Sequence, residues 1–548
     1  MSDPLHSPAS AHPAPSAETN VVDTLQSLTV AFALAMTVRS FVTEGFVIPT
    51  GSMAPTLAGA HFSFRSPETA YEYSIDFGPV LGAAAMNGGQ LPQGSRGLVD
   101  PMINPLVPIA QWDYRKITSE ARMGDRVLVL KYLYAFSEPQ RWDVVVFKNP
   151  TDPVGDTQNY IKRLVGIENE QLLTVDGDVW TAPLGAPLAD FRVQRKPEHV
   201  QRAVWQPVHD SDYVPVDPQA MSQRMGRSYD GPPWVGEHWD TSGRAYHCDT
   251  AEPTTLHWRA ATMPIDDRCG YNALQLRETP YPVSDIRVRA AVEAEDITKW
   301  SMDLQLEARS HTMRWQLNDG NATLLVVRRD TGAIVAEETT PCRLPAQGAS
   351  CDIECWHVDH SLSLWINGTK MAELVYDHWT PEDRVRFSFP GLDLETYRRT
   401  PVGPLPDAAL LAWNVAGSPV TFHHVAVDRD LYYRPNGLAP GNQCPTNGPF
   451  VQGLAFGSDL NAPAQLEADQ FLMMGDNSAY SRDGRVWGRP HPLVQAQLGE
   501  TSPFIVPREL LLGKAWCVYF PAPLPVRMPD GRSGKAIVPD IGSNRFIR

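Results

Sequence analysis

Positive charge is scarce in this 548-residue chain, which has 47 Lys and Arg against 63 Asp and Glu and a formal net charge of −16. Proteins that bind nucleic acid gain affinity by neutralising phosphates with basic side chains, so we expect no nucleic-acid partner. No Lys or Arg precedes an apolar run that begins near residue 22. This absence argues against a cleaved leader and removes the charge asymmetry that predicts membrane orientation.

Cysteine is also sparse, with seven residues in the chain, at 248, 269, 342, 351, 355, 444 and 517. The two segments that carry the candidate catalytic residues below contain none, which disfavours a thiol mechanism. The odd count leaves at least one thiol unpaired, and both disulfides and buried thiols fit the cluster between 248 and 355. The pattern Cys351-x3-Cys355-x-His357 lacks a clear fourth ligand, so we expect no metal site and no cofactor.

The N-terminal region divides into a polar and an apolar part. Residues 1–20 are rich in Pro, Ala and Ser, which predicts a disordered tail. Residues 21–43 are mainly apolar and have about the 20 residues that a bilayer crossing needs, which predicts a transmembrane helix. The alternative is an amphipathic core helix, because Gln26, Thr29 and Arg39 interrupt the run. No second span is expected.

Short runs of β-branched residues dominate the rest of the chain and predict a mainly β protein. An Asn-Gly pair at 367–368 between two such runs predicts a hairpin. Changes in composition suggest further segments: core residues 44–61, an insertion at 62–121, core residues 122–190, an inserted antiparallel β-sandwich at 191–440, core residues 441–528 and a polar tail at 529–548.

Ser52 and Lys162 are the candidate catalytic pair. Ser52 lies in a Pro-flanked Gly-Ser-Met turn just after the apolar run, and Lys162 lies inside a strand-like run beside Ile161 and Leu164. A serine hydroxyl needs an adjacent base, and a desolvated, neutral lysine can serve when no suitable histidine motif is present. Burial can lower a lysine pKa from ~10.4 by ~3–5 units. The alternative for Lys162 is a strand-edge lysine that points into water.

A third motif spans Met474 to Gly488 and contains Gly-Asp-Asn-Ser followed by Ser481, Asp483 and Arg485. Alone it could be a solvated turn with a structural ion pair. Together, the three motifs resemble, in content and order, type I signal peptidases, over roughly residues 21–61, 122–170 and 468–521. The family implies a signal-peptidase-type β core behind one transmembrane helix.

The resemblance also implies roles for single residues. Ser52 matches the nucleophile and Lys162 the general base, while Thr50 and the Ser52 backbone N–H match the oxyanion hole. Ser481 matches a serine that orients the lysine, and Asp483 and Arg485 match a structural ion pair. The positions that line the apolar substrate pockets in the family correspond to Phe46, Ile48, Met53, Leu57, Tyr160 and Ile161, each of which could equally belong to the core.

Two departures from the family stand out. Residues 167–170 read Ile-Glu-Asn-Glu where a Pro-Gly-Asp turn is usual, and Gly484 replaces a serine. The sandwich region, from about 228 to 435, resembles concanavalin-type lectins and glucanases in its pattern of alternating strands and hairpins. Carbohydrate binding through exposed tryptophans is one expected use of it, and a protein-contact or structural role is another.

The sequence therefore predicts a single-pass enzyme of the cell membrane, with its catalytic domain on the extracytoplasmic side. Its expected activity is a Ser/Lys endopeptidase that removes signal peptides from exported preproteins after small residues. One alternative is a catalytically idle peptidase scaffold that presents a carbohydrate- or protein-binding sandwich. Another is a self-cleaving repressor-like protease, which the lack of a basic DNA-binding head disfavours.

Overall fold

Strands far outnumber helices in the structure, a computed structural model, and the predicted mainly β class is confirmed. The residues it describes are 17–80, 90, 95–103, 108–113, 121–152, 159–226, 228–275, 279–344, 350–399, 405–435, 455–521, 524–527, 533–538, 542 and 544–548. Most of the expected disordered tail at 1–20, parts of the 62–121 insertion and of the 529–548 tail, and Cys444 lie outside them.

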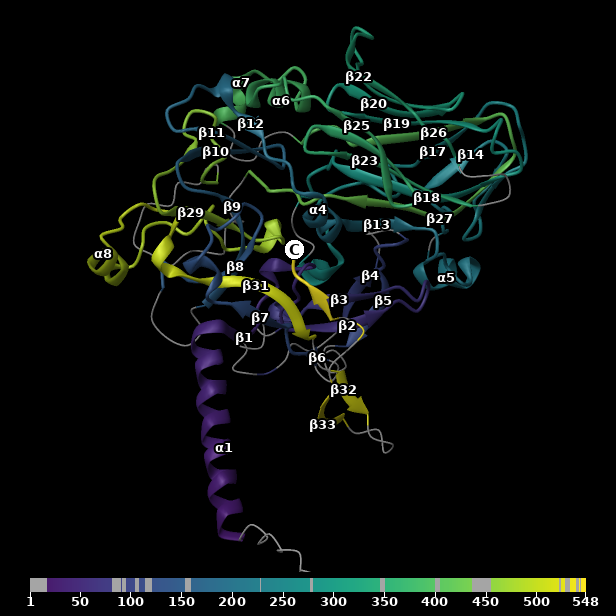
Figure 1. Ribbon diagram of the computed structural model, residues 1–548. Coiled ribbons are helices and arrows are strands. Elements are labelled where there is room, and N and C mark those ends of the chain that lie inside the picture. The colour runs from purple at the N-terminus through teal and green to yellow at the C-terminus, as the bar shows by residue number, and fades with distance from the viewer. Residues whose placement is uncertain are drawn as a thin grey trace, which may run out of the picture.

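The apolar run forms α1 (Ala17–Thr37), which continues as a π-helical turn over Val38–Val42. The mainly apolar stretch Val21–Val42 has 22 residues and extends ~33 Å at 1.5 Å per residue, enough to cross the hydrocarbon core of a bilayer. Every side chain from 21 to 42 is exposed, and α1 projects from the body of the molecule as a stalk (Figure 1). The alternative of a buried core helix is therefore wrong.

The sheet that carries the candidate catalytic residues follows α1 directly. It is assembled in the order β1-β7-β31-β8-β9-β29-β30, with β34 added on β31, so strands that are distant in sequence lie side by side. Most residues of β8 and β9 are buried, including Lys162 and Arg163 of β9. The strand bounds are Thr43–Val47 (β1), Arg126–Leu130 (β7), Leu511–Phe520 (β31), Val144–Lys148 (β8), Asn159–Gly166 (β9), Gln470–Met474 (β29), Val506–Pro507 (β30) and Arg545–Phe546 (β34).

A small sheet, ordered β12-β11-β10-β28, lies between this core and the inserted domain, and two smaller pieces occupy the 62–121 region. These strands are Arg192–Val193 (β12), Asp178–Pro183 (β11), Glu170–Val175 (β10), Ala464–Leu466 (β28), His61–Arg65 (β2), Glu72–Asp76 (β3), Ala121–Arg122 (β6), Ser95–Val99 (β4) and Pro108–Asp113 (β5). Near the C-terminus, β32 (Leu524–Arg527) pairs with β33 (Ser533–Val538).

The inserted domain consists of two antiparallel sheets packed face to face (Figure 1). Along β19 and β20 buried and partly exposed residues alternate, because one face of the sheet packs on the other sheet. One sheet contains Trp239–Asp240 (β15), Tyr246–Cys248 (β16), Val420–Arg429 (β27), Ile286–Ala294 (β18), Cys351–Val358 (β23), Ser361–Ile366 (β24), Thr369–Val375 (β25) and Gln206–Asp210 (β13). The other contains Trp234–Gly236 (β14), Thr254–Trp258 (β17), Leu410–Ala416 (β26), Ser301–Ala308 (β19), His311–Asn318 (β20), Asn321–Arg328 (β21) and Ile334–Pro341 (β22).

The predicted Asn-Gly hairpin is confirmed between β24 and β25. Ile366 pairs with Thr369, so Asn367 and Gly368 form a two-residue loop, and both have positive φ, at 49° and 75°. A type I′ turn requires positive φ at both central residues, which Asn and Gly adopt at low cost. Apart from α1, the α-helices among the described residues are short: Glu198–Val204 (α4), Pro218–Met225 (α5), Pro381–Ser388 (α6), Leu394–Arg399 (α7) and Pro492–Leu498 (α8).

Thiols, not disulfides, occupy the cysteine positions that the structure describes. Cys248, Cys342, Cys351 and Cys355 are free and buried, and Cys269 and Cys517 are free and partly exposed. Burial raises the pKa of the Cys351 thiol to about 12, so this group is protonated and unreactive at neutral pH. Of the two alternatives, the structure has the buried thiols.

Candidate active site

Ser52 lies in a short 3₁₀ turn, Gly51–Met53, that follows β1. The turn is tied to the core because Ile48 N–H donates to the Asp125 carbonyl at 2.9 Å. Gly51 is required by packing, since a Cβ at this position would lie 2.2 Å from Cε1 of Tyr271. The turn therefore has a fixed conformation, and Ser52 is partly exposed at its apex.

Lys162 extends from β9 toward this turn, and its Nζ is hydrogen-bonded to Ser52 Oγ. The lysine is only 3% exposed. Burial lowers the pKa of Lys162 to about 8, Asp483 and Asp476 oppose the shift, and Arg485 adds to it. With a pKa of about 8, roughly one lysine in ten is neutral at pH 7, far more than for an exposed lysine with a pKa of ~10.4.

The segment after β29 surrounds this pair with charges that are themselves neutralised. Asp476 accepts from Arg163 Nε at 2.8 Å and Nη2 at 2.7 Å, and Thr56 Oγ1 donates to the same carboxylate at 2.6 Å. Asp483 accepts from Arg485 Nε at 2.9 Å and Nη2 at 2.8 Å. Both carboxylates are buried beside Lys162, but each is engaged by an arginine, so neither forms an ion pair with the amine.

Ser481 lies against the same structure. A Cβ on Gly475 would lie 2.1 Å from Ser481 Oγ and 2.4 Å from the Ser52 carbonyl oxygen, so only glycine allows both serines to approach here. Within the described ranges the Ser481 hydroxyl makes no direct hydrogen bond to Lys162. Burial alone would raise the pKa of Asp483, but Arg485 and the Gly475 N–H hold it below its usual value. The orienting role of Ser481 stays a prediction.

The residues expected at substrate pockets fall into two groups. Phe46, Ile48, Met53, Leu57 and Ile161 belong to one apolar cluster beneath the Ser52 turn, and all except Phe46 are buried. Tyr160 belongs to another cluster, where its ring packs on Phe147 and Trp487. Thr50 is exposed, in extended conformation, immediately before the turn.

Both departures from the family pattern have a local explanation. Asn169 has a φ of 63°, so it supplies the left-handed residue that the tight turn between β9 and β10 needs. At position 484 a Cβ would lie 2.6 Å from Leu472 Cδ1 and 2.8 Å from the Phe504 carbonyl oxygen. Only glycine fits at position 484 in this structure.

Several residues around the pair were not singled out by the sequence. Asn477 donates from its N–H to the Ser52 carbonyl at 3.1 Å and from Nδ2 to the Gly51 carbonyl at 2.9 Å. Arg163 follows Lys162 on β9 and neutralises Asp476. Arg163 lies in the Lys162 motif and Asn477 in the Gly-Asp-Asn-Ser motif, so their membership of these motifs could have identified them as site residues. Tyr271 and Asn272 come from the insertion, where the sequence gave no such signal.

One group of side chains has the composition of a cation site. Buried oxygens of Asp178, Asp285 and Asp359 lie within 4.8 Å of one another. However, Arg384 Nη2 is 3.4 Å from Asp178 and 3.9 Å from Asp285, and Lys196 Nζ contacts both oxygens of Asp359 at 2.8 and 2.9 Å. The protein's own cations therefore occupy this cluster, which joins β11 of the small sheet to the inserted sandwich.

A family model matches part of the chain. Residues 110–231 match the model of the family described as "Signal peptidase, peptidase S26". A comparison with curated proteins finds no match. The matched range contains Lys162, Arg163 and Tyr160, whereas Ser52 and the Ser481 segment lie outside it.

Solved structures similar to this chain include the carbohydrate-binding module CBM66 from Bacillus subtilis, at 7% identity and a TM-score of 0.22, covering 36% of this chain and 97% of that one. Sheep galectin-11 matches at 9% identity and a TM-score of 0.18, covering 27% and 92%. A Bacillus subtilis protein of unknown function with a galectin-like fold matches at 9% identity and 0.22, covering 36% and 87%. Scores this low carry no argument about ligands, and the family match supports a signal-peptidase-type domain at residues 110–231.

Proposed function

We propose that this protein is a membrane-anchored Ser/Lys endopeptidase that removes signal peptides from exported preproteins. The observation that carries the proposal is the hydrogen bond between Ser52 and the buried amine of Lys162. A lysine with a pKa near 8 can accept the serine proton at a useful rate near neutral pH. The match to a signal peptidase family model over residues 110–231 supports the same reaction class.

In the proposed reaction, Ser52 Oγ attacks the carbonyl carbon of the scissile bond while its proton passes to Lys162. The oxyanion is stabilised by the Ser52 backbone N–H and the Thr50 hydroxyl, and Lys162 then donates its proton to the leaving amine. Water, activated by the same lysine, hydrolyses the acyl-enzyme and releases Ser52. No cofactor takes part in these steps.

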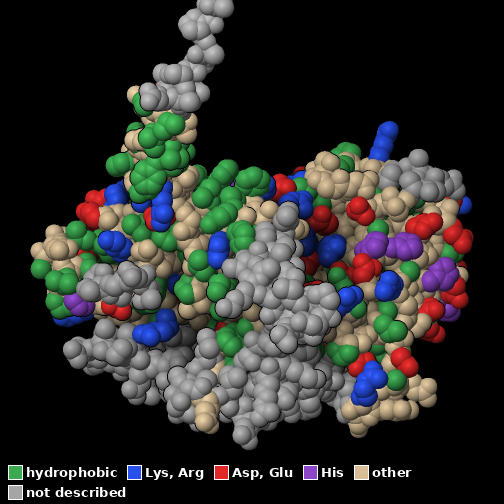
Figure 2. Space-filling view, turned by 90° about the horizontal axis from the view of Figure 1, so that it is seen from below, with side chains coloured by type: hydrophobic (Ala, Val, Ile, Leu, Met, Phe, Trp, Pro, Cys, Tyr) green, Lys and Arg blue, Asp and Glu red, His purple; other side chains and the backbone are tan. Residues whose placement is uncertain are grey.

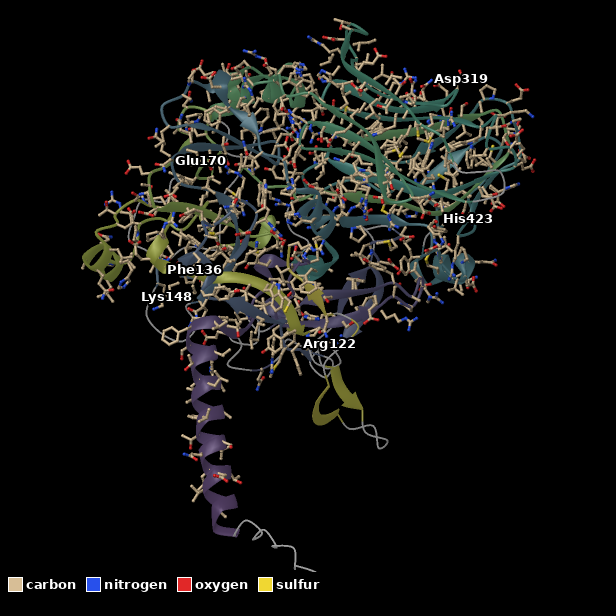
Figure 3. All side chains as sticks on the ribbon, in the orientation of Figure 1. Arg122, Phe136, Lys148, Glu170, Asp319 and His423 are labelled. Carbon is tan, nitrogen blue, oxygen red and sulfur yellow. The ribbon has the colours of Figure 1, made fainter. Side chains whose placement is uncertain are left out.

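The surface around the base of α1 supports a location at the bilayer. Figure 2 shows hydrophobic side chains gathered where the helix meets the body, and Figure 3 shows Phe136 close to that junction. Phe136 is 85% exposed. Exposed apolar residues of the adjoining strands are Val47, Trp516, Tyr519 and Phe546. We propose that this face rests on the membrane, on its extracytoplasmic side, where exported preproteins emerge.

Stacking of sugars on exposed tryptophans was the mechanism expected for carbohydrate binding by the sandwich, and the structure does not favour it. Every tryptophan of residues 191–440 except Trp239 is buried, so the sandwich presents no row of exposed indole rings on which sugars could stack. Binding of a carbohydrate or a protein by the sandwich stays a prediction. The alternative of a catalytically idle scaffold that presents this sandwich also stays a prediction.

The test is cleavage of a preprotein with an Ala-x-Ala site by detergent-solubilised full-length protein. Wild type should cut after the final small residue, and Ser52→Ala and Lys162→Ala should reduce kcat by several orders of magnitude. Lys148→Ala is the matched control, because Lys148 is an exposed lysine on the neighbouring strand β8 (Figure 3). Equal activity of wild type and Ser52→Ala would contradict the proposal.

A further inference from the structure

A short segment of the inserted domain reaches the nucleophile turn. Residues Gly270–Gln275 form a 3₁₀ turn, and the Tyr271 ring packs directly on Gly51. Ala273 and Leu274, in the same segment, are buried in an apolar cluster with strands β2, β3 and β4. The segment is therefore anchored on the side away from Ser52 and presents Tyr271 and Asn272 to the active-site turn.

Asn272 and Asn477 form a reciprocal amide pair. Asn272 Nδ2 donates to Asn477 Oδ1 at 2.8 Å, and Asn477 Nδ2 donates to Asn272 Oδ1 at 2.9 Å. Both side chains are buried, at 7% and 6% exposure. Asn477 Nδ2 also donates to the Gly51 carbonyl, so both of its N–H groups and its oxygen are used. Asn272 thus fixes the rotation of the amide that holds Gly51.

The Gly51 carbonyl belongs to the same peptide unit as the Ser52 N–H. A peptide unit is planar and trans, so its C=O and N–H point in opposite directions. When Asn477 holds the Gly51 oxygen on one side, the Ser52 N–H is directed to the other side. This N–H is the oxyanion donor of the proposed reaction, and the strength of such a donor depends on its direction.

A second set of contacts ties Asp267, three residues before this segment, to the Lys162 side of the site. Arg429, at the end of β27, donates to the Asp267 carbonyl at 3.0 Å, and Arg434 pairs with the Asp267 carboxylate. Arg434 N–H donates to Ser478 Oγ at 2.9 Å, and Arg485 Nη1 donates to the same oxygen at 2.7 Å. The sandwich is therefore connected to the arginine that neutralises Asp483.

We propose that Asn272 is a positioning residue for catalysis, which acts through Asn477 to direct the oxyanion-binding N–H of Ser52. The inserted domain then completes the active site, and this inference rests on the proposed peptidase function. The role of Asn272 differs from that of Ser52 and Lys162, because Asn272 contacts neither the substrate nor the reacting atoms.

The test compares Asn272→Ala, Asn477→Ala and the double variant in the full-length, detergent-solubilised protein. Asn272→Ala should lower kcat about tenfold, with KM and the midpoint of the pH profile unchanged, because an oxyanion donor acts only in the transition state. The double variant should be no slower than Asn477→Ala, since Asn272 acts through Asn477. Additive losses would overturn the inference, as would wild-type kcat in Asn272→Ala.

Asn321→Ala is the matched control, since Asn321 begins β21 in the sandwich and its Nδ2 donates to the Asp319 carbonyl at 3.3 Å. Figure 3 shows Asp319 on the side of the molecule away from α1. It should behave as wild type. If wild type itself cleaves nothing, the proposed function fails; if wild type and Asn272→Ala cleave alike, only this inference fails.

A second measurement guards against loss of folded protein. We would compare the dissociation constants of two ligands, a peptide aldehyde and an uncleavable peptide. The adduct of the aldehyde with Ser52 places an oxygen at the oxyanion position, and the uncleavable peptide forms no adduct. Both are equilibrium constants of the folded protein. Asn272→Ala should weaken the aldehyde about tenfold and leave the uncleavable peptide unchanged. Equal weakening of both ligands would overturn the inference and indicate a structural role.

Discussion

Arg485 holds the carboxylate of Asp483 through two hydrogen bonds, beside the buried amine of Lys162. Asp483 is the strongest of the negative charges that raise the Lys162 pKa, whereas Arg485 lowers it. The pair therefore has only a small net effect on the lysine pKa, because Arg485 neutralises most of the charge of the nearby carboxylate. This balance leaves burial as the dominant effect on Lys162.

Arg485→Gln should raise the Lys162 pKa, because Asp483 loses its arginine and its full charge acts on the amine. In wild type kcat/KM should rise with pH through about 8, since only the neutral lysine accepts the serine proton. In Arg485→Gln the rise should begin at higher pH. The measurement is kcat/KM from pH 6 to 10. Arg508→Gln is the control, because Arg508 pairs with Glu168 and Asp469 and not with Asp483. An unchanged midpoint would show that the Lys162 pKa does not depend on the neutralisation of Asp483 by Arg485.

Thr50→Val should reduce kcat about 10²–10³-fold, because the hydroxyl supplies one of two proposed oxyanion donors. Thr50 is exposed, so its substitution by a residue of similar shape should leave stability unchanged. Thr50→Ser keeps the hydroxyl and should retain most activity. Kinetics on the Ala-x-Ala preprotein and a thermal melt check both statements, and an active Thr50→Val would remove the residue from the mechanism.

The sequence predicted the local features well because they depend on neighbouring residues. β-branched runs specified the strands, Asn367 and Gly368 specified a hairpin, and the apolar run specified α1. The Ser52 and Lys162 segments were found by motif. These features need only the periodicity and chemistry of a few consecutive residues.

The remaining features depend on packing between distant segments. β31 lies between β7 and β8 in the sheet, although more than 350 residues of sequence separate β31 from either strand. No local pattern encodes this pairing. The contact of Tyr271 with Gly51 also joins an insertion to the core. Carbohydrate binding through exposed tryptophans was one of the uses expected of the sandwich, but the two sheets enclose most of these residues, since large apolar side chains fill the space between sheets.

Gly484→Ser should destabilise the protein although serine is the usual residue of the resembled family. The added side chain meets Leu472 and the Phe504 carbonyl at distances that require the backbone to shift. Overpacking of this kind costs about 1–3 kcal/mol. Urea unfolding followed by tryptophan fluorescence measures the change. Gly243→Ser is the control for added bulk at an open position, because the nearest atom to a Cβ there is the Ala245 carbonyl oxygen at 3.9 Å and the backbone φ is an ordinary one. Unchanged stability of Gly484→Ser would show that this turn can relax.

Asp178→Asn should stabilise the protein at pH 8. Burial and the nearby Asp285 raise the pKa of Asp178 well above its ordinary value, while Arg384 opposes this only in part. The folded protein therefore holds a proton that the unfolded chain releases at a pKa of ~3.9, so stability falls as the pH rises from about 4 through the folded pKa. Asparagine removes this cost, because it is neutral at every pH and nearly the same size.

The melting temperature of Asp178→Asn should exceed that of wild type at pH 8, and the difference should shrink as the pH approaches 4. Asp359→Asn is the contrasting variant: both oxygens of Asp359 accept from Lys196, so its loss removes a partner of a buried ammonium and should lower the melting temperature. A lower melting temperature for Asp178→Asn at pH 8 would mean that the Asp178 charge stabilises the junction between the sandwich and the small sheet. In that event the attraction of Arg384 for Asp178 outweighs burial and the repulsion of Asp285.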